Sequence, residues 1–359
     1  MRLEVHTDAG AFHRVRAEWD GLLPRSHGDT LFQRPAWLGA WWQVFGSEGT
    51  LRLVTVRDHG GRLVGVAPFF LASVAADATQ PVPNLSVERP APDSSATMHR
   101  ALMLVGGTEV SDYLDLVIER GQEDAVYAAL CRALTDELAG WEWMDLHGLP
   151  EGSPTPAALG RWAAQNGLTA TLVTEDVCPY VTLPDSWPAY LRLLGRKERH
   201  ELRRKMNKLA LNAQVAVRVV SDAAELEQAL PVFIALHEAS ATDKADFMRD
   251  PRMRRFFGLI AQEAAANGWL DLSFLSLDGE AVASVFCFRY GDAVLVYNSG
   301  FLPQAWPSLS PGIVLLGLRI QQAIADGQRE FDFLQGNERY KYDLGGQDRI
   351  VQRLFIRRP

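Results

Sequence analysis

A set of short sequence patterns occurs twice along this chain, in the same order. Residues 219–223 (VVSDA) repeat the pattern of residues 5–9 (VHTDA). The other matched pairs are Arg34-Pro35 with Asp250-Pro251, the hairpin patterns at 53–69 and 272–288, and the strand patterns at 142–148 (EWMDLHG) and 330–336 (EFDFLQG). Matched anchors in one order predict that the chain consists of two copies of one folding unit.

Each copy is predicted to contain, in this order, a strand, two helices, a hairpin, a strand, a helix, a strand, a helix and a strand. Hairpins join antiparallel strands, whereas a strand–helix–strand connection joins parallel ones. The expected fold class is therefore α/β (α+β), with two tandem units that each hold a mixed, mostly antiparallel sheet flanked by helices. We expect the units to span residues 1–168 and 169–359, with a basic helix at 190–209 ahead of the second sheet.

Composition and charge narrow the class of protein. The 359 residues are 47% apolar and 22% charged, which is typical of a soluble globular protein. The formal net charge of −8 argues against a dedicated nucleic-acid-binding protein. The sequence shows neither a signal peptide nor a run of 18 apolar residues, so a cytoplasmic protein without a membrane span is expected. Three widely spaced cysteines give no disulfide framework and no metal-ligand spacing, and no metal is expected.

The strongest candidate for a binding feature is the start of a helix in the second copy. An apolar strand at 293–299 leads into a loop that ends in Ser310-Pro311-Gly312, and a helix follows over residues 313–325. Serine is a favourable N-cap, proline suits the first helical position, and Gly327 ends the helix. The N–H groups that are free at such a start favour an anion such as a phosphate. The candidates are Ser310, Pro311, Gly312, Ile313 and Val314; the alternative is an ordinary helix cap.

The corresponding helix start in the first copy is acidic. Residues 118–124 read IERGQED, and their carboxylates would repel a phosphate. We therefore place the anion site in the second copy and give the first a supporting, degenerate role. Residues 75–107, rich in Pro, Ala, Ser and Asp, are expected to form a long loop in the first copy.

Polar residues also gather where the strand at 330–335 ends. Loops at the carboxyl ends of parallel strands commonly hold ligands. Asp332 alternates with two phenylalanines, and a buried carboxylate needs a partner or a function. Glu338 could accept a proton from an attacking amine, Tyr340 could protonate a leaving thiolate, and Lys341 could pair with a phosphate or carboxylate. The alternative is an ordinary turn of mixed charge.

Two further residues are candidates with a structural alternative. His237 stands near a predicted helix end, and the pKa of histidine suits a general base near neutral pH. A lone histidine at such a place is also commonly structural. Tyr297, on the strand before the loop at 310–312, belongs either to the core or to the lining of the same site.

A basic segment separates the two copies. Residues 192–208 hold eight Lys/Arg and two Asp/Glu, which gives a local charge of +6 (8 − 2). At helical spacing Arg192, Arg196, Arg199 and Arg203 form one stripe, and leucines form another. Arg203 and Arg204 are candidates for contact with cofactor phosphates or RNA, and the alternative is a solvated helix face.

These segments together resemble a known enzyme family. Residues 310–312 and 331–341 (FDFLQGNERYK) resemble the GNAT-type acetyltransferases of the CelD/BioF2-like group, which are related to the Fem aminoacyltransferases and contain two GNAT units. Residues 197–204 (KERHELRR), and His237 with Lys244 and Phe247, also resemble the group's pattern. The resemblance covers most of the chain and is strongest between residues 190 and 342.

The resemblance implies a GNAT-type N-acyltransferase that uses acyl-CoA, with acetyl-CoA as the expected donor. It also implies that the helix at Pro311 faces the pyrophosphate, and that the acceptor is a small molecule or a precursor of the envelope or of a polysaccharide. Members often carry tryptophans where this chain has Ser240-Ala241 and Asp343-Leu344, so the acceptor pocket is expected to differ in shape. Two alternatives stay open: a Fem-like transferase that uses aminoacyl-tRNA, and a non-catalytic ligand-binding protein.

Overall fold

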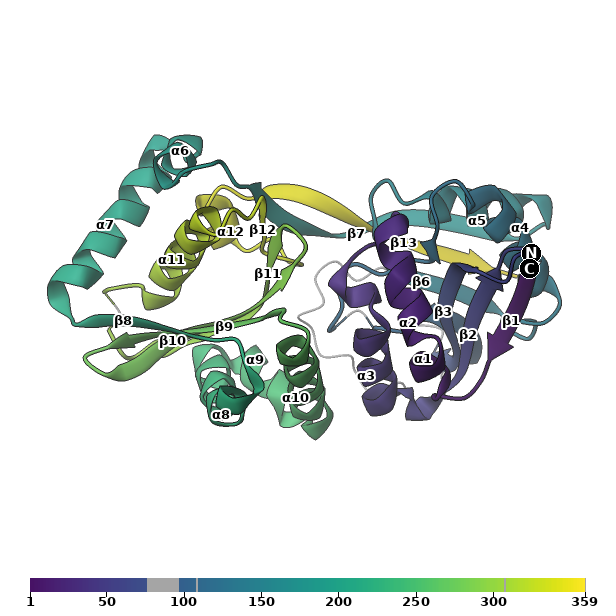
Figure 1. Ribbon diagram of the computed structural model, residues 1–359, viewed down its shortest axis with the longest axis horizontal. Helices are drawn as coiled ribbons and strands as arrows, with labels where there is room; N and C mark the ends of the chain where they lie inside the picture. The colour runs from purple at the N-terminus through teal and green to yellow at the C-terminus, as the bar shows by residue number, and fades with distance from the viewer. Residues whose placement is uncertain (76–96, 108, 307, 359) are drawn as a thin grey trace. The chain divides into compact units, whose positions relative to one another are not determined.

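The structure is a computed structural model that describes residues 1–75, 97–107, 109–306 and 308–358. The chain divides into two compact units, which are described separately (Figure 1). Unit 1 comprises Met1–Asp176 and Ile350–Pro359, and unit 2 comprises Val177–Arg349. The division expected between residues 168 and 169 stays a prediction, while the contacts group the last residues, from Ile350, with unit 1.

Unit 1 contains short helices and a sheet. Its elements are β1 (Arg2–His6), α1 (Ala11–Arg14), α2 (Arg16–Leu22), η1 (Leu23–Arg25), η2 (Leu31–Gln33), α3 (Pro35–Phe45), η3 (Gly46–Glu48), β2 (Gly49–Arg57), β3 (Leu63–Ala75), β4 (Met98–Leu104), β5 (Val117–Ile118), α4 (Glu123–Thr135), β6 (Trp143–Pro150), α5 (Pro154–Gln165) and most of β13 (Gln347–Arg357).

The sheet of unit 1 has the strand order β1-β2-β3-β4-β6-β13, with the short β5 beside β3. Neighbouring strands run antiparallel except β4 and β6, which are parallel and are joined through β5 and α4. The predicted loop at 75–107 lies mostly outside the described residues, and its end is not loop, because residues from Met98 form β4.

Unit 2 repeats this plan. Its elements are the end of β7 (Thr169–Thr182), α6 (Trp187–Leu193), α7 (Arg196–Asn212), β8 (Val215–Val220), α8 (Ala223–Ser240), α9 (Thr242–Arg249), α10 (Pro251–Ala266), β9 (Leu270–Leu277), β10 (Glu280–Tyr290), β11 (Ala293–Phe301), α11 (Pro311–Ala325), β12 (Glu330–Asp332) and α12 (Arg339–Asp343).

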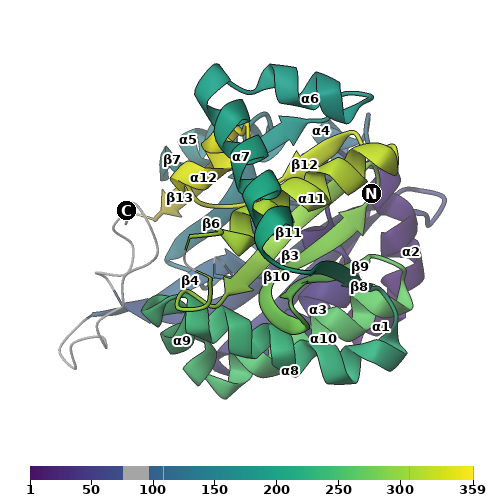
Figure 2. The ribbon, with the colours of Figure 1, turned by 90° about the vertical axis from the view of Figure 1, so that its left-hand side faces the viewer.

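The sheet of unit 2 has the strand order β8-β9-β10-β11-β12-β7. Here β11 and β12 are the parallel pair, joined through α11, and the other described pairs are antiparallel. Helices cover both faces, with α8, α9 and α10 on one and α11 and α7 on the other (Figures 1 and 2). The expected fold class, two tandem units with mixed and mostly antiparallel sheets flanked by helices, is confirmed.

The final strand of each sheet comes from the other half of the sequence. β7 begins in unit 1, which includes its residues up to Asp176, yet its end pairs with β12 through Tyr180–Thr182. β13 follows the elements of unit 2, yet it pairs with β6 through Val351–Arg357. The repeat in sequence is therefore not a repeat of two independent segments, because each copy receives its last strand from the other.

Buried aromatic side chains form much of the core of unit 2. Phe233 of α8, Phe257 of α10 and Phe286 of β10 pack against one another between helices and sheet. On the other face, α11 is fixed to the sheet by a buried ion pair, in which Arg319 donates to Asp271 of β9 at 2.5 Å. These contacts hold the helices at defined positions beside β11.

One local prediction is wrong. The basic helix expected at 190–209 is two helices, because Leu194 is extended and Gly195 precedes the start of α7. The stripe predicted to join Arg192 to Arg196 is therefore broken. Elsewhere, the residues after Ala241 form helix α9, Val15 separates α1 from α2, and β7 runs through Pro179 without a break.

Within the described residues, none of the helices has the length and apolar character needed to cross a bilayer.

Candidate active site

The parallel strands β11 and β12 pair over only part of their length. Ala293, Val294 and Leu295 pair with Glu330, Phe331 and Asp332, whereas β11 continues to Phe301. On its other side β11 stays paired with β10, with a register shift that leaves Tyr297 between Val296 and Asn298 as a bulge. A bulge bends its strand and strengthens the local twist. The second half of β11 therefore diverges from β12, and within the described residues the ladder between the two strands ends at Leu295.

Tyr297, at this bulge, lies in an aromatic cluster. Its ring packs 5.4 Å from the ring of Phe257 and 5.4 Å from that of Phe288, measured between centroids. The side chain is half-buried, so Tyr297 serves the core and stands where the strands part.

Helix α11 begins beyond the end of β11. Pro311 is its first residue, and Gly327 with a positive φ ends it, as expected. Ser310 occupies the N-cap position in the left-handed conformation, with φ of 51°, and in the described part of the chain its side chain makes no capping hydrogen bond. The prediction of a serine cap is therefore right in position and wrong in mechanism. The N–H groups of the first turn keep the capacity to bind another acceptor.

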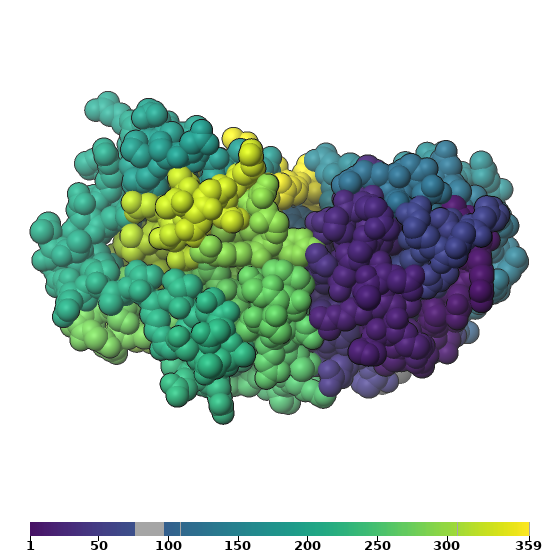
Figure 3. Space-filling model, viewed as in Figure 1, coloured from purple at the N-terminus to yellow at the C-terminus, as the bar shows by residue number. Residues whose placement is uncertain are grey.

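Three residues of this first turn differ in their surroundings. A Cβ at Gly312 would lie 3.7 Å from the Phe301 ring, an ordinary contact. Val314 is buried in the core and donates its N–H to the carbonyl of Ser310 at 3.1 Å. Ile313 is half-buried and faces a groove between α7, α11 and α12, together with Lys197, Leu202, Lys205, Arg339 and Tyr340. The side chains of α7 (teal) and α12 (yellow) lie side by side in Figure 3.

The segment after β12 has a strained backbone held by side chains. Leu334 adopts a positive φ of 57°, a conformation that is costly for a residue with a Cβ. Asp332 is fully buried; one of its carboxylate oxygens accepts the Leu334 N–H at 2.7 Å, and the other accepts from Arg349 at 3.0 Å. Asp332 is therefore placed to fix the backbone of this segment, and its predicted position on a buried strand end is correct.

Lys341 fixes the same segment from the other side. Its ammonium is buried and donates to the carbonyls of Leu334, Gln335 and Gly336 at 2.9, 2.6 and 3.0 Å. It also lies 3.0 Å from a carboxylate oxygen of Glu338. The predicted partner, a phosphate or carboxylate of a ligand, is thus met within the chain by Glu338, and Lys341 acts on the backbone.

Glu338 and Tyr340 follow on the short helix α12. Glu338 is the N-cap residue and more than half exposed, so its carboxylate reaches solvent while Lys341 holds one of its oxygens. The Tyr340 ring packs edge-on against Phe333 on the apolar core. Burial, with a contribution from the nearby Glu338, raises the pKa of the Tyr340 hydroxyl, so this group stays protonated at neutral pH.

His237 lies on α8 against the diverging half of β11. Its Nδ1 donates to the carbonyl oxygen of Ser299 at 3.0 Å, which leaves Nε2 as the unprotonated nitrogen of the neutral ring. Burial, together with the positive charge of Lys244, lowers the pKa of His237 to about 4. Only glycine fits at position 300, because a Cβ there would lie 2.3 Å from the His237 backbone nitrogen. The close packing of α8 on β11 thus depends on Gly300.

Arg203 and Arg204 lie on exposed turns of α7. Arg204 pairs with Glu201, at 2.8 Å between its terminal nitrogen and the carboxylate. The leucines predicted to form the apolar stripe are buried, including Leu202 and Leu209, so the arginines face away from the core. They lie on the helix that borders the groove beside Ile313.

Residues 196–342 match a family model described as an acetyltransferase (GNAT) domain. This part of the chain is a GNAT domain. No curated protein matches the sequence significantly. Among solved structures, a crystal structure of FemX has a TM-score of 0.62 at 12% identity, with 99% of this chain and 97% of that chain covered.

Two further solved structures have the same fold. A protein of unknown function from Bacteroides thetaiotaomicron VPI-5482 has a TM-score of 0.59 at 12% identity, with 99% of this chain and 100% of that chain covered. The C-terminal domain of a putative lysylphosphatidylglycerol synthetase from Agrobacterium fabrum has a TM-score of 0.51 at 10% identity, with 97% and 92% covered. At such identities the likeness is one of fold.

The expected resemblance is confirmed for a GNAT-like group with the FemX fold. The domain is that of an acyltransferase in general. It brings Tyr297, His237, Glu338, Lys341 and Tyr340 to the region where β11 and β12 part or to the segment after β12. The start of α11 lies beyond the end of β11, whereas Arg203 and Arg204 lie on α7.

Sequence reasoning missed several residues of this region. Arg349, which holds Asp332 and Glu330, lies 17 residues from Asp332 on a segment with no visible motif. The contact of Lys244 with Ser299 depends on helix α9, which the sequence analysis did not predict. The sequence pattern that could have predicted α9 is the charge-rich, helically periodic segment that begins at Thr242.

A buried charged cluster in unit 1 was also missed. His147, within β6, contacts the carboxylates of Asp145, at 3.1 Å, and Glu175. Arg353 of β13 forms two hydrogen bonds with Asp145, each 2.7 Å. Burial alone would lower the pKa of His147, but the two carboxylates outweigh it and raise the pKa to about 9. Every charge in this cluster has an opposite partner.

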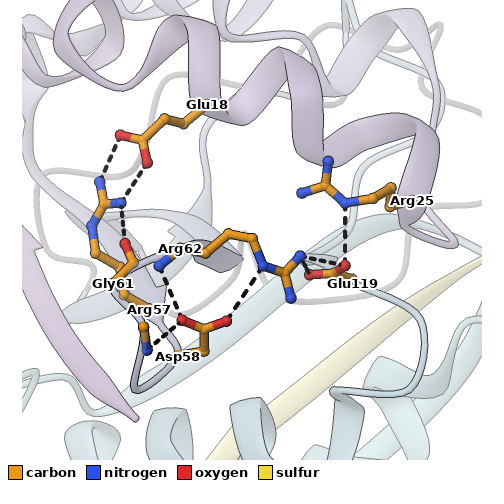
Figure 4. Close-up of polar contacts among 8 residues, drawn as sticks. Glu18, Arg25, Arg57, Asp58, Gly61, Arg62 and Glu119 are labelled. Atoms are coloured by element: carbon orange, nitrogen blue, oxygen red, sulfur yellow. Dashed lines mark hydrogen bonds and ion pairs between the residues drawn. The ribbon is translucent and has the colours of Figure 1, made fainter.

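The surface of unit 1 near its acidic helix start is paired in the same way (Figure 4). Glu119, just before α4, accepts hydrogen bonds from Arg25, at 3.1 Å, and from Arg62. Arg57 donates to Glu18 at 2.8 Å. The first turn of α4 carries Glu123 and Asp124, as the sequence predicts. These ion pairs connect the β2–β3 hairpin with α2, η1 and the segment before α4. The first turn of α4 stays acidic.

Proposed function

We propose that this chain transfers an acyl group, with acetyl as the expected one, from acyl-CoA to an amine by direct attack. The observation that carries the proposal is the parting of β11 from β12 beside a helix start without a side-chain cap. The parted edge of β11 offers backbone groups to the thioester arm, and the N–H groups at Gly312 and Ile313 offer donors to the pyrophosphate. Ser310, Pro311 and Val314 form the turn that presents them.

The polar groups near the strand ends suit the proton transfers of this reaction. Glu338 takes the proton of the attacking amine, because its carboxylate is exposed and its position is fixed by Lys341. Tyr340 gives a proton to the leaving thiolate, because its hydroxyl stays protonated. Asp332 and Lys341 hold the segment that carries Glu338, and Tyr297 supports the bend of β11. His237 is the competing base, weakened by a pKa of about 4.

A second candidate function is transfer from aminoacyl-tRNA. The exposed arginines of α7, Arg203 and Arg204 among them, favour this alternative because a polyanion would meet a basic helix face. Binding of tRNA by such a face weakens steeply as salt rises. Binding of a short acyl-CoA at the start of α11 does not need this basic face of α7.

Calorimetry separates these candidates. The full chain is titrated with acetyl-CoA, with longer acyl-CoAs and with tRNA at two salt concentrations, and turnover is followed on a panel of amines. We expect binding of acetyl-CoA and acetyl transfer to an amine. Binding of tRNA without acyl-CoA binding favours the second candidate, and acyl-CoA binding without turnover on any amine favours a non-catalytic binding protein.

A further inference from the structure

Lys244 stands in an unusual place for a lysine. It lies in the first turn of α9, its side chain is half-buried, and its Nζ donates to the carbonyl oxygen of Ser299 at 2.7 Å. The same oxygen accepts from His237, so both of its lone pairs are in use. The contact fixes where the ammonium lies, next to the diverging half of β11.

The ammonium of Lys244 lacks a carboxylate partner within the described residues. No carboxylate oxygen of this part of the chain lies within 4.0 Å of Nζ, and Ser299 is its one hydrogen-bond acceptor there. Two of its three N–H donors are therefore unused by the described protein. Burial lowers the pKa of Lys244 and Lys341 acts in the same direction, whereas the charges of Asp243 and Glu338 raise it. A cation partly removed from water without a carboxylate in direct contact is costly.

Lys341 provides the contrast within the same region. Its ammonium is saturated by three carbonyls and by Glu338. It therefore has nothing left to offer a ligand. Lys244, by comparison, keeps a charge and two donors, and it is close enough to Glu338 for that carboxylate to act on its charge.

The charges nearby select the kind of anion. Lys341 pairs with Glu338, His237 is neutral, and the adjacent Asp243 acts on the charge of Lys244 without forming an ion pair with it among the described residues. Lys244 therefore offers a positive charge and two unused donors close to two carboxylates. Asp243 and Glu338 would repel a phosphate dianion about twice as strongly as a carboxylate, which brings one negative charge and two oxygens to one ammonium.

We infer that Lys244 binds the carboxylate of the acceptor, so that the acceptor is an amine that also carries a carboxylate, as an amino acid does. The inference rests on the proposed function, because Glu338 receives the proton of the same molecule's amine. Lys244 then determines specificity for the acceptor and makes no contact with the acyl-CoA donor.

The test compares amines that differ only in this charge. Glycine, 4-aminobutyrate and 6-aminohexanoate are titrated calorimetrically into the full chain with desulfo-CoA, beside their amides and 2-aminoethyl phosphate. We expect at least one amino acid to bind about 10-fold or more tightly than its amide, since hydrogen bonds to charged groups are the strong ones. Equal affinities or absent binding in every pair overturns the inference, and so does a preference for the phosphate.

Two variants assign the preference to Lys244. Lys244→Met keeps the length of the side chain and is expected to fold with an unchanged or higher Tm, because His237 still donates to Ser299. It should lose the preference for the carboxylate. Lys208→Met is the matched control, because the Lys208 Nζ also donates to a backbone carbonyl, that of Ser308 at 3.0 Å, but lies on α7. A preference retained in Lys244→Met, or lost in Lys208→Met, overturns the inference.

The donor titration keeps this test separate from that of the proposed function. If acetyl-CoA binds and acetylates amines without preference for a carboxylate, the inference fails and the proposed function stands. If the amino acids bind but acetyl-CoA does not, the proposed function fails and the carboxylate site stands as a binding site.

Discussion

The two units follow one topology, and they differ in the chemistry of the crossover between their parallel strands. In unit 1 the helix after β4, α4, starts with Glu123 and Asp124, and paired charges surround His147 within β6. In unit 2 the helix after β11 starts at Pro311 without acidic residues in its first turn, and the strands part at the bulge. The same topology therefore carries paired charges in unit 1, whereas in unit 2 it presents a helix start whose N–H groups could bind a ligand.

The two buried histidines show this difference in their protonation. His147 lies between two carboxylates with a pKa of about 9 and is charged at neutral pH. His237 is buried near Lys244 with a pKa of about 4 and is neutral. Burial alone does not determine the charge of a histidine, because neighbouring charges decide whether the desolvation cost is overcome.

The largest expected effect is on turnover. Glu338→Gln should lower kcat about 100- to 10,000-fold, the usual contribution of a positioned general base, with an unchanged dissociation constant for acetyl-CoA. The amide oxygen can still accept from Lys341, so the segment should keep its conformation. Steady-state kinetics with calorimetry measure both quantities, and His237→Gln is the comparison. A larger loss of kcat in His237→Gln would move the base to α8.

The next effect is on the donor. Gly312→Asp should weaken acetyl-CoA binding about 100-fold or more, because it puts into unit 2 the negative charge that unit 1 carries. Gly312→Ala is the steric control and should bind within a few-fold, since a Cβ there meets only the Phe301 ring at 3.7 Å. Asp124→Ala in unit 1 should leave the calorimetric affinity unchanged. Unchanged affinity in Gly312→Asp contradicts the assignment of the donor site.

The pH dependence of stability separates the two histidines. The folded-state pKa of His147, about 9, is above the usual 6.5, so its stabilisation is complete below pH 6.5 and is lost as pH rises to 9. The folded-state pKa of His237, about 4, is below 6.5, so its neutral burial lowers stability as pH falls from 6.5 to 4. Each window, about 2.5 pKa units wide, changes the free energy of unfolding by about 3.5 kcal/mol at most, at about 1.4 kcal/mol per pKa unit.

Urea unfolding between pH 4 and 9 measures both windows. His147→Gln should flatten the curve above pH 6.5 and leave the acidic side unchanged. His237→Gln should flatten the curve below pH 6.5 only. Identical pH profiles for the two variants would contradict the difference in protonation between His147 and His237.

The smallest expected effect concerns Ser310. Because its φ is positive and its side chain makes no capping bond within the described residues, Ser310→Gly should leave stability unchanged or raise it by up to about 1 kcal/mol. An ordinary serine cap would instead lose stability on removal of the hydroxyl. Thermal unfolding of the variant distinguishes the two.

The repeat, the order of elements along the chain and the helix at Pro311 could be predicted because they depend on local periodicity and on glycine and proline signals. The roles of single polar residues could not. Asp332 and Lys341 were visible as polar residues at a strand end, but their partners, Arg349 and the carbonyls of 334–336, are set by tertiary packing. The break at Leu194 was hidden because Arg192 and Arg196 keep a helical spacing across it.

The exchange of final strands between the two halves has a consequence for synthesis. The sheet of unit 1 acquires β13, with Arg353 and its buried neighbours Val351, Leu354 and Ile356, only after residues 350–358 have left the ribosome. The amino-terminal half must therefore wait, with an open sheet edge and with Asp145 lacking its arginine, through the whole translation of unit 2. A gene cut between the halves would leave each fragment short of a strand that the other encodes.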